Sequence, residues 1–416
     1  MLGTLYRTRI LTGMSQNKKK QNKNRCYDVV IIGGGPAGLS LACSLSRLNL
    51  RIAIIEKQTE DILAAPPVDG RDIALTHFSE EILHDLGIWP HIPANEISEI
   101  REAKVLNGTS PYALNFDHHD TDKNYLGRII PNYLIRKAAY RTVKNCKNVE
   151  IITGQEATAI NSEQHKADVT LSNGDTVSCA LVAAADSRFS PSRRKMGIPT
   201  EMKDFGRVVI VCEMTHEKPH NHIAHECFHY EQTLAVLPLN GNKSSVVITL
   251  PADKADEVVA MNEKDFSADI TRRFENRLGP MTLTGNRYPY PLIAVYADRF
   301  IARRFALIGD AAVGMHPVTA HGFNLGLKGQ HILSECVNNA LKTGIDIGSL
   351  AVLEPFQSRY RHATRPLYLG TNTIVNLYTK ETTAAKIARR ALLRLGNKIK
   401  PARRLIIEQL TETKAS

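Results

Sequence analysis

The sequence lacks closely spaced cysteine pairs and an unbroken hydrophobic run long enough to span a membrane. Its seven cysteines are odd in number and widely spaced, without a C-x-x-C pair. This pattern argues against a zinc ribbon or a dithiol relay and favours a reducing compartment. The uncharged run 29–45 approaches the length of a membrane span, but Gly33-Gly34-Gly35-Pro36 would break a helix in its middle. We therefore predict no transmembrane segment and no metal site.

Acidic residues are missing from the N-terminal end and scarce at the C-terminal end. Residues 1–26 hold seven Lys or Arg and no acid, and 380–416 hold ten basic residues against three acids. The remaining 27–379 hold 36 basic and 39 acidic residues, although the whole chain has a net charge of +11. This balance argues against a basic nucleic-acid groove through the folded core, and no nucleic-acid partner is expected.

The basic tail 1–26 lacks the apolar stretch of a secretory signal. Two interpretations stay open: a solvated basic tail, with translation starting at Met14 as a variant, or a mitochondrial presequence. The rest of the chain has an ordinary globular composition, 43% hydrophobic with a mean hydropathy of −0.22. At 416 residues it should form two domains.

A β-α-β unit begins at Tyr27. The β-branched run 28–32 predicts a strand buried on both faces, a glycine-rich turn follows, and Leu39, Leu41, Ala42 and Leu45 have helical spacing. A second buried strand, 52–55, ends at Glu56. Helices are predicted at 79–89, 132–144 and 323–342, and hairpin strands at 98–126. Alternating residues between 205 and 295 predict an antiparallel sheet.

The turn carries the motif G-x-G-x-x-G in its functional context. Gly33 would make the tight turn, Gly35 would let a pyrophosphate approach the backbone, and Gly38 would let helix and strand pack closely. Glu56, eighteen residues past Gly38, would accept hydrogen bonds from a ribose hydroxyl. We predict a dinucleotide site rather than a structural glycine turn.

Two later motifs specify which dinucleotide. Ala185-Asp186-Ser187-Arg188-Phe-Ser190-Pro-Ser-Arg193 resembles A-D-G-x-x-S-x-x-R, and Leu307-Ile-Gly-Asp310 follows a third buried strand. With these three motifs in order, 27–365 resembles the class A flavoprotein monooxygenases of the para-hydroxybenzoate hydroxylase-like fold. Within that family, the chain is most similar to the ubiquinone-biosynthesis ring hydroxylases, particularly the bacterial subgroup called UbiM. Three segments carry this similarity: 309–327, Asp69-Gly70-Arg71 and Asn132-Tyr-Leu-Ile-Arg136.

The resemblance implies an α/β fold in which a Rossmann-like FAD-binding domain is interleaved with a mostly antiparallel substrate domain. The expected FAD-binding domain comprises 27–97, 127–204 and 296–355. The substrate domain would comprise 98–126 and 205–295, and 356–416 would form C-terminal helices. In departure from the family pattern, Ser187 replaces a usual glycine, Val313 a common histidine, and Thr319-Ala320-His321 the usual A-G-Q.

By the same resemblance, FAD is the cofactor. Asp310 would hold its ribityl chain, Gly322, Phe323 and Asn324 would open a helix aimed at the flavin, and Arg71 and Arg136 would lie near the cofactor. The expected cofactor-binding residues are Gly33, Gly35, Ala37, Gly38, Glu56, Arg71, Arg136, Asp186, Asp310, Gly322, Phe323 and Asn324.

The candidate catalytic residues are His316, Pro317 and His321, although both histidines could merely cap the loop. His222, His225 and His229 could resemble metal ligands, but surface or partly buried histidines are the favoured interpretation. In a strand, His225 and His229 would share a face that His222 does not.

The implied reaction is hydroxylation of the aromatic ring of a polyprenylated ubiquinone precursor, a phenol or quinol, by O2 through a flavin C4a-hydroperoxide. A prenyl-lipid reductase or epoxidase of the same superfamily, and a non-catalytic FAD-bound subunit of a lipid-biosynthesis complex, stay as alternatives. A tryptophan halogenase is disfavoured, because a chain whose one tryptophan is Trp89 cannot contain W-x-W-x-I-P.

The electron donor would be NAD(P)H or a ferredoxin-type protein, and other ubiquinone-biosynthesis proteins are possible partners. The basic amphipathic stretch 386–398 favours either an anionic membrane surface or packing on the core. The expected location is cytoplasmic and peripheral on the inner membrane, or mitochondrial if 1–26 is a presequence.

Overall fold

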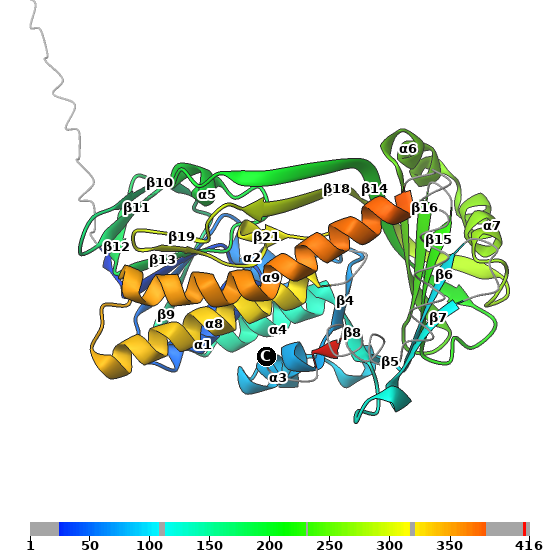
Figure 1. Cartoon of the computed structure of the whole chain (residues 1–416), viewed down its shortest axis with the longest axis horizontal. Coiled ribbons are helices and arrows are strands. Elements are labelled where there is room, and N and C mark those ends of the chain that lie inside the picture. The colour runs from blue at the N-terminus through cyan, green and yellow to red at the C-terminus, as the bar shows by residue number, and fades with distance from the viewer. Residues whose placement is uncertain (1–24, 108–112, 230–231, 317–320, 380–410, 413–416) are drawn as a thin grey trace, which may run out of the picture.

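A six-stranded sheet of continuous apolar strands forms one half of the molecule (Figure 1). The computed structural model describes residues 25–107, 113–229, 232–316, 321–379 and 411–412. The sheet order is β19-β20-β13-β2-β3-β9, parallel except for the β19 edge. Its strands are β2 (Val29–Ile32), β3 (Ile52–Glu56), β9 (Val149–Thr153), β13 (Leu181–Ala184), β19 (Ile301–Ala302) and β20 (Phe305–Leu307). The central strands β2, β3 and β13 are buried at every residue, as their β-branched and alanine sequences require.

Four helices pack around this sheet. They are α1 (Pro36–Ser46), α4 (Asn132–Lys144), α8 (Gly322–Thr343) and α9 (Leu350–Thr379). Helices α1 and α8 contact each other, and α9 lies across α8 and runs toward the other half of the molecule (Figure 1). A small sheet, β1-β12-β11-β10, lies at the outer end and comprises β1 (Arg25–Cys26), β10 (Ala157–Ser162), β11 (Ala167–Leu171) and β12 (Thr176–Cys179).

An eight-stranded sheet dominates the second half, in the order β21-β18-β14-β17-β16-β15-β6-β7. Its strands are β6 (Glu102–Asn107), β7 (Ala113–Asp117), β14 (Thr200–His216), β15 (Ile223–His229), β16 (Gln232–Pro238), β17 (Lys243–Pro251), β18 (Met281–Ala297) and β21 (Val313–Gly314). The long strands β14 and β18 run from one half of the molecule into the other (Figure 1). All neighbouring pairs are antiparallel except β15 and β6.

The two faces of this large sheet have different neighbours. On the helix face, Ile210, Val246 and Ile248 pack against Phe266 and Ile270 of the covering helices. Those helices are α6 (Ala252–Ala260) and α7 (Glu263–Arg273). The opposite face, which we call the inner face, carries Val209, Val211 and Val247 beside Phe205 and Tyr290.

A three-stranded sheet, β4-β8-β5, joins the two halves. It contains β4 (Asp72–Leu75), β5 (Ser98–Ile100) and β8 (Gly127–Pro131). Short helices complete the described chain: α2 (Glu60–Ala64), α3 (His77–Asp85), α5 (Pro191–Lys195), η1 (Trp89–His91), η2 (Ala94–Glu96), η3 (His118–Asp120) and η4 (Gly309–Ala311).

The predicted fold class is confirmed: a Rossmann-like α/β half is interleaved in sequence with a mostly antiparallel sheet. The helix expected at 79–89 instead begins at His77 and ends at Asp85, because Thr76 caps its start by accepting a hydrogen bond from Ser79 N. Within the described ranges, no helix is long and apolar enough to cross a membrane.

Candidate active site

The glycine turn between β2 and α1 has the shape of a phosphate cradle. Gly33 has φ +110°, and a Cβ there would lie 2.5 Å from the Ala185 carbonyl oxygen. A Cβ on Gly38 would lie 2.0 Å from the Gly33 oxygen, so both positions require glycine. A Cβ on Gly35 would meet no atom within 4 Å. The turn is therefore crowded behind Gly33 and Gly38 and open at Gly35, at the positive end of α1, where a pyrophosphate fits.

Glu56 supports this turn from the end of β3. Its side chain is buried, with Oε2 accepting a hydrogen bond from Gly34 N at 2.6 Å and Oε1 one from Gln58 N at 2.8 Å. A carboxylate has about four acceptor sites, so two can still receive ribose hydroxyls. The sequence predicted only the ribose role and missed the support of the turn.

The second motif folds around Asp186. Its carboxylate accepts hydrogen bonds from Ser190 Oγ and, at 2.9 Å, from Ser192 N, which fixes the start of α5. Ser187 has φ +87° and so takes up a left-handed conformation that favours glycine. The contacts described for Asp186 are structural, and its expected place among the cofactor-binding residues stays a prediction.

Arg193 closes the second motif onto the third. Its side chain is 1% exposed and donates to the carbonyl oxygens of Ala311 at 2.7 Å and Arg188 at 3.0 Å. Burial lowers the pKa of the Arg193 guanidinium, while the charge of Asp186 opposes that shift. The buried arginine thus fixes η4, the short helix that contains Asp310.

The third motif brings Asp310 to the edge of the cradle. Gly309, at φ +58°, would place a Cβ 3.1 Å from the Ala37 methyl group, and a Cβ on Gly326 would lie 3.5 Å from Gly309 Cα. Small residues therefore bring the first turn of α1, η4 and α8 together. The Asp310 side chain is 37% exposed and pairs with Arg188 at 3.2 Å.

Helix α8 starts beside the same edge. Asn324 anchors its first turn by accepting from Thr76 N at 3.2 Å and donating to Ala74 O at 2.9 Å. Gly322 has open space around its Cα, and Phe323 is half-buried. The first N–H groups of this 22-residue helix form a positive end suited to a delocalised anion.

Residue Glu412, near the end of the chain, also reaches this region. Its carboxylate pairs with Lys328 Nζ of α8 at 3.2 Å and accepts a hydrogen bond from Thr76 Oγ1 at 2.9 Å. The short described segment 411–412 accordingly lies beside α3 in Figure 1. Nothing in the sequence pattern indicated this contact.

Arg71 and Arg136, both expected near the cofactor, have different partners. Arg71 pairs with Asp69 at 2.6 Å and lies 5.6 Å from the centre of the Tyr290 ring. Burial lowers the pKa of Arg71, but the hydrogen bond and the charge of Asp69 outweigh it, and the net shift is upward. Arg136 donates to Gln58 Oε1 at 3.1 Å, and burial lowers its pKa.

His316 and His321 are both buried, at 4% and 2% exposure. The His316 ring meets Phe205 edge-on at 5.2 Å, which places it against the inner face of the large sheet. Burial, helped by Arg207 and Lys203, lowers the pKa of His316 to about 4. His316 is therefore neutral near pH 7 and cannot serve as a cationic acid there. Pro317 lies outside the described residues.

Among the side chains that the structure describes, His222 and His225 belong to no group of three or more residues that could hold a metal. His225 lies on the helix face against the Phe274 ring at 5.2 Å, and burial lowers its pKa to about 4. Strand β15 begins at Ile223, after His222, and lies between β16 and β6 in the interior of the sheet. Within the described ranges, the group close enough to share a metal is instead Asp117, His118 and His119 on the surface after β7.

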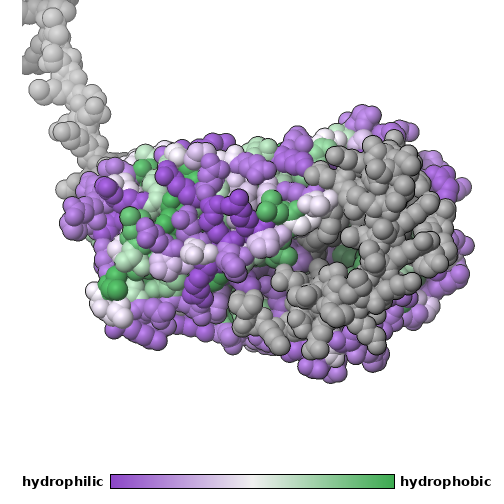
Figure 2. Space-filling view, viewed as in Figure 1, coloured by the Kyte–Doolittle hydropathy of each residue, from purple (hydrophilic) through white to green (hydrophobic). Residues whose placement is uncertain are grey.

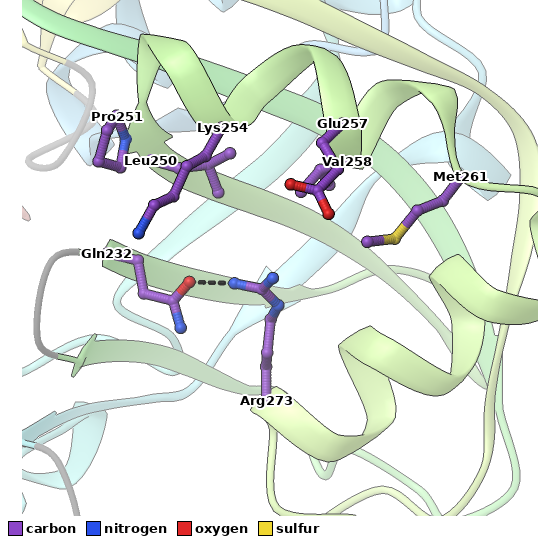
Figure 3. Close-up of a pocket in the computed structure, with 8 residues that line it drawn as sticks. All are labelled: Gln232, Leu250, Pro251, Lys254, Glu257, Val258, Met261 and Arg273. Atoms are coloured by element: carbon purple, nitrogen blue, oxygen red, sulfur yellow. Dashed lines mark hydrogen bonds between the residues drawn. The ribbon is translucent and has the colours of Figure 1, made fainter.

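A cavity of about 280 Å³ opens on the other side of the large sheet (Figure 3). Leu250 and Val258 in its wall belong to the helix-face core, and Arg273 donates a hydrogen bond to Gln232 across it. The sheet separates this cavity from the inner face, where His316, Tyr290 and Arg71 converge. It is therefore not the dinucleotide site.

The family model for an FAD binding domain matches residues 26–345. The chain belongs to the class A FAD-dependent monooxygenases. FAD is its cofactor, and the crowding at Gly33 and Gly38 with open space at Gly35 fits the pyrophosphate of that cofactor.

Among similar proteins, this monooxygenase is 44% identical to ubiquinone hydroxylase UbiM of Neisseria meningitidis over 92% of this chain and 84% of that protein. It is 31% identical to ubiquinone hydroxylase UbiL of Rhodospirillum rubrum over 94% and 90% of the two chains. The crystal structure of p-nitrophenol 4-monooxygenase PnpA from Pseudomonas putida has the same fold, with a TM-score of 0.75, 18% identity and coverage of 94% and 100%.

Proposed function

We propose that this monooxygenase hydroxylates the aromatic ring of a polyprenylated ubiquinone precursor with O2. The observation that carries the proposal is the 44% identity, over 92% of the chain, to a ubiquinone hydroxylase. The apolar inner face of the large sheet, with Val209, Val211 and Val247, supports it, because a prenylated ring needs an apolar wall.

The first and third motifs would divide the binding of FAD between them. Gly33, Gly35 and Gly38 would receive the pyrophosphate, Glu56 the ribose hydroxyls, and Asp310 the ribityl chain. When bound and reduced, FAD supplies the activation of O2 and the transfer of one oxygen atom. The positive end of α8 would stabilise negative charge beside it, and Asn324 keeps that end in position.

The inner face would supply the water-excluded surroundings that oxygen transfer requires. Neutral His316 would accept or donate one hydrogen bond there without carrying charge. We propose that 98–126 and 205–295 form the substrate domain against a discontinuous FAD-binding domain of 27–97, 127–204 and 296–355.

The decisive experiment is analysis by mass spectrometry of the quinone intermediates that accumulate in a deletion strain. A precursor lacking one ring hydroxyl group would support the proposal, and an unchanged quinone pool would contradict it. A product reduced or epoxidised in its prenyl chain would instead support the alternative activities.

Purified enzyme with NADH, NADPH or reduced ferredoxin, assayed with and without a prenylated phenol, would identify the electron donor. Substrate-stimulated oxidation of the donor would distinguish an enzyme from a non-catalytic FAD-bound subunit.

Peripheral attachment to a membrane is part of the proposal, because a polyprenylated substrate resides in lipid. On the face shown in Figure 2, hydrophobic residues form separate small patches among hydrophilic ones. Leu341, Ile345 and Leu350, at the turn between α8 and α9, are exposed by 40%, 45% and 51%. The basic amphipathic stretch 386–398 lies outside the described residues.

A further inference from the structure

Glu226 lies in the middle of β15 and points to the inner face of the large sheet. Successive side chains of a strand point to opposite faces. The adjacent Cys227 belongs to the helix-face core, whereas Ala224 packs with Ile129 and Leu126 on the other side. Glu226 has the parity of Ala224 and therefore shares its face.

The register places Glu226 in a row of side chains that crosses the sheet. Glu226 is opposite Ala235, Ala235 opposite Val247, Val247 opposite Val211, and Val211 opposite Tyr288. The other residues of the row are apolar or aromatic. With strands about 4.8 Å apart, the row from Val211 to Glu226 is long enough to hold an aromatic ring with part of its prenyl chain.

The far end of this row touches the cofactor-binding region. A Cβ on Gly70 would lie 2.2 Å from the Tyr288 ring, so that ring packs directly on the backbone next to Arg71. Tyr290, two residues on, donates a hydrogen bond to Asp69 O at 2.5 Å. The row thus leads from the arginine beside the cofactor to a single carboxyl group.

Within the part of the chain that the structure describes, Glu226 has no partner that balances its charge. Among the described residues, no hydrogen bond or ion pair reaches its carboxyl group, and burial raises its pKa to about 8. The residue as a whole is half-buried, which leaves a small ligand access to it. The flanking positions on the same face, Thr233 and Ala235 of β16 and Ala103 and Val105 of β6, do not titrate.

The ionisable side chains at the neighbouring positions His225 and Lys104 belong to the other face of the sheet. Lys104 is opposite His225, whose ring packs against Phe274 on the helix face, and Lys104 pairs with Glu102 at 3.3 Å. A desolvated carboxyl group without a partner costs stability, and such groups are concentrated at functional sites, where a ligand can supply the missing partner.

We propose that Glu226 is a catalytic residue that accepts the proton of the substrate's ring hydroxyl group. The inference rests on the proposed ring hydroxylation. In this step the phenol O–H bond breaks, its electron pair stays on oxygen as phenolate, and the proton binds a carboxylate oxygen of Glu226. Release of that proton to water restores the carboxylate.

The proton transfer has a chemical benefit and a suitable driving force. A phenolate ring is richer in electrons than a phenol and reacts more readily with an electrophilic oxygen atom. An ordinary glutamate, with a pKa near 4.3, is a poor base for a phenol with a pKa of about 10. Burial brings the two values closer together, as general base catalysis requires.

The test compares the wild type with Glu226→Gln and Glu226→Asp, using ortho-prenylphenol as the probe. In the wild type, kcat/KM should rise with pH through about 8. Glu226→Gln should lower it roughly 100-fold or more and remove that rise, whereas Glu226→Asp should keep a pH-dependent limb. Glu102→Gln on neighbouring β6, part-exposed and paired with Lys104, is the matched control and should behave like the wild type.

A second measurement does not depend on turnover. Titrating the oxidised FAD-bound enzyme with the probe should produce phenolate absorbance at a pH below the probe's own pKa in the wild type but not in Glu226→Gln. Equal phenolate formation and equal pH profiles in both would overturn the assignment. If Glu226→Gln loses its flavin or its thermal stability, Glu226→Asp decides: a stable, flavin-bound Glu226→Asp enzyme without a pH-dependent limb would contradict proton acceptance.

The two measurements also separate this inference from the proposed function. If the wild type binds the probe as phenolate but no phenol or deletion-strain precursor gains oxygen, the proposed function fails while the assignment of Glu226 stands. If wild type and Glu226→Gln hydroxylate the probe at equal rates, the assignment of Glu226 fails while the proposed function stands.

Discussion

Arg188 and Asp310 form an ion pair at 3.2 Å although 122 residues separate them in the sequence. The pair joins the second motif to the third and holds the Asp310 carboxylate at the edge of the FAD cradle. Arg188 also donates to Ile293 O at 3.1 Å, which ties this corner to β18. The position of the Asp310 carboxylate therefore depends on contacts with β18 as well as on the second motif.

Replacing Asp310 by Ala should release much of the flavin and abolish activity while the chain stays folded. The carboxylate is 37% exposed, so its loss leaves no buried charge uncompensated. Flavin absorbance per protein and the thermal melting temperature would measure both effects. Glu335→Gln, which breaks the surface pair with Arg359, is a suitable control. Full activity of the Asp310→Ala enzyme would refute the assignment.

The glycine turn predicts a contrast between two alanine substitutions. Gly35→Ala meets no atom within 4 Å, so the apoprotein should keep its stability but bind FAD less tightly, because the new methyl group occupies space needed by the pyrophosphate. Gly38→Ala would place a carbon 2.0 Å from the Gly33 oxygen and should lose both stability and FAD. Chemical denaturation of the two apoproteins and FAD titration give the comparison. Similar stability losses in both variants would contradict it.

Glu56→Ala should cost about 1–3 kcal/mol of FAD binding, because polar partners of the carboxylate are left unpaired. The structure adds that the apoprotein should also be destabilised, since Gly34 N and Gln58 N lose their acceptor. Glu56→Gln keeps one amide oxygen as an acceptor and should lie between the wild type and Glu56→Ala. Calorimetric titration with FAD would test this order, and unchanged affinity in Glu56→Ala would exclude the role.

His316 should make stability depend on pH. Its folded-state pKa of about 4 is below its ordinary value near 6.5, so the unfolded chain binds its proton first as the pH falls. The free energy of unfolding therefore keeps the full contribution of neutral His316 above about pH 6.5 and loses it as the pH falls toward 4. The loss at pH 5 should be roughly 2 kcal/mol. Urea unfolding of wild type and His316→Gln at pH 7 and pH 5 would measure it. An equal pH dependence in both proteins would show that His316 is not the cause.

The basic C-terminal stretch should contribute to membrane binding. Each Lys or Arg near an anionic surface contributes about 1 kcal/mol, screened over roughly 8 Å at physiological salt. Replacing Arg389, Arg390 and Arg394 by Gln should reduce co-sedimentation with anionic liposomes while hydroxylation of a soluble short-chain phenol continues. If this stretch instead packs on the core as a helix, the variant should bind liposomes as the wild type does, or should lose stability and with it the activity on the soluble phenol.

The local features of this protein follow from its sequence. Gly33 and Gly38 are required by their backbone conformation and by close contacts at the β-α-β turn, and the acid at the end of β3 lies next to the turn by connectivity alone. Continuous β-branched runs indicate the buried strands. The sequence therefore determined the cofactor-binding half and, through three ordered motifs, the family.

Contacts between distant segments were decided only by the tertiary structure. Neither the ion pair of Arg188 with Asp310 nor that of Lys328 with Glu412 has a local signal, because each joins residues far apart in the chain. The alternation within β15 puts Glu226 and His225 on opposite faces, but only packing against α7 and β8 shows which face is inner. A shift of one residue would exchange the two, so the place of the Glu226 carboxyl group follows from register and packing and not from composition.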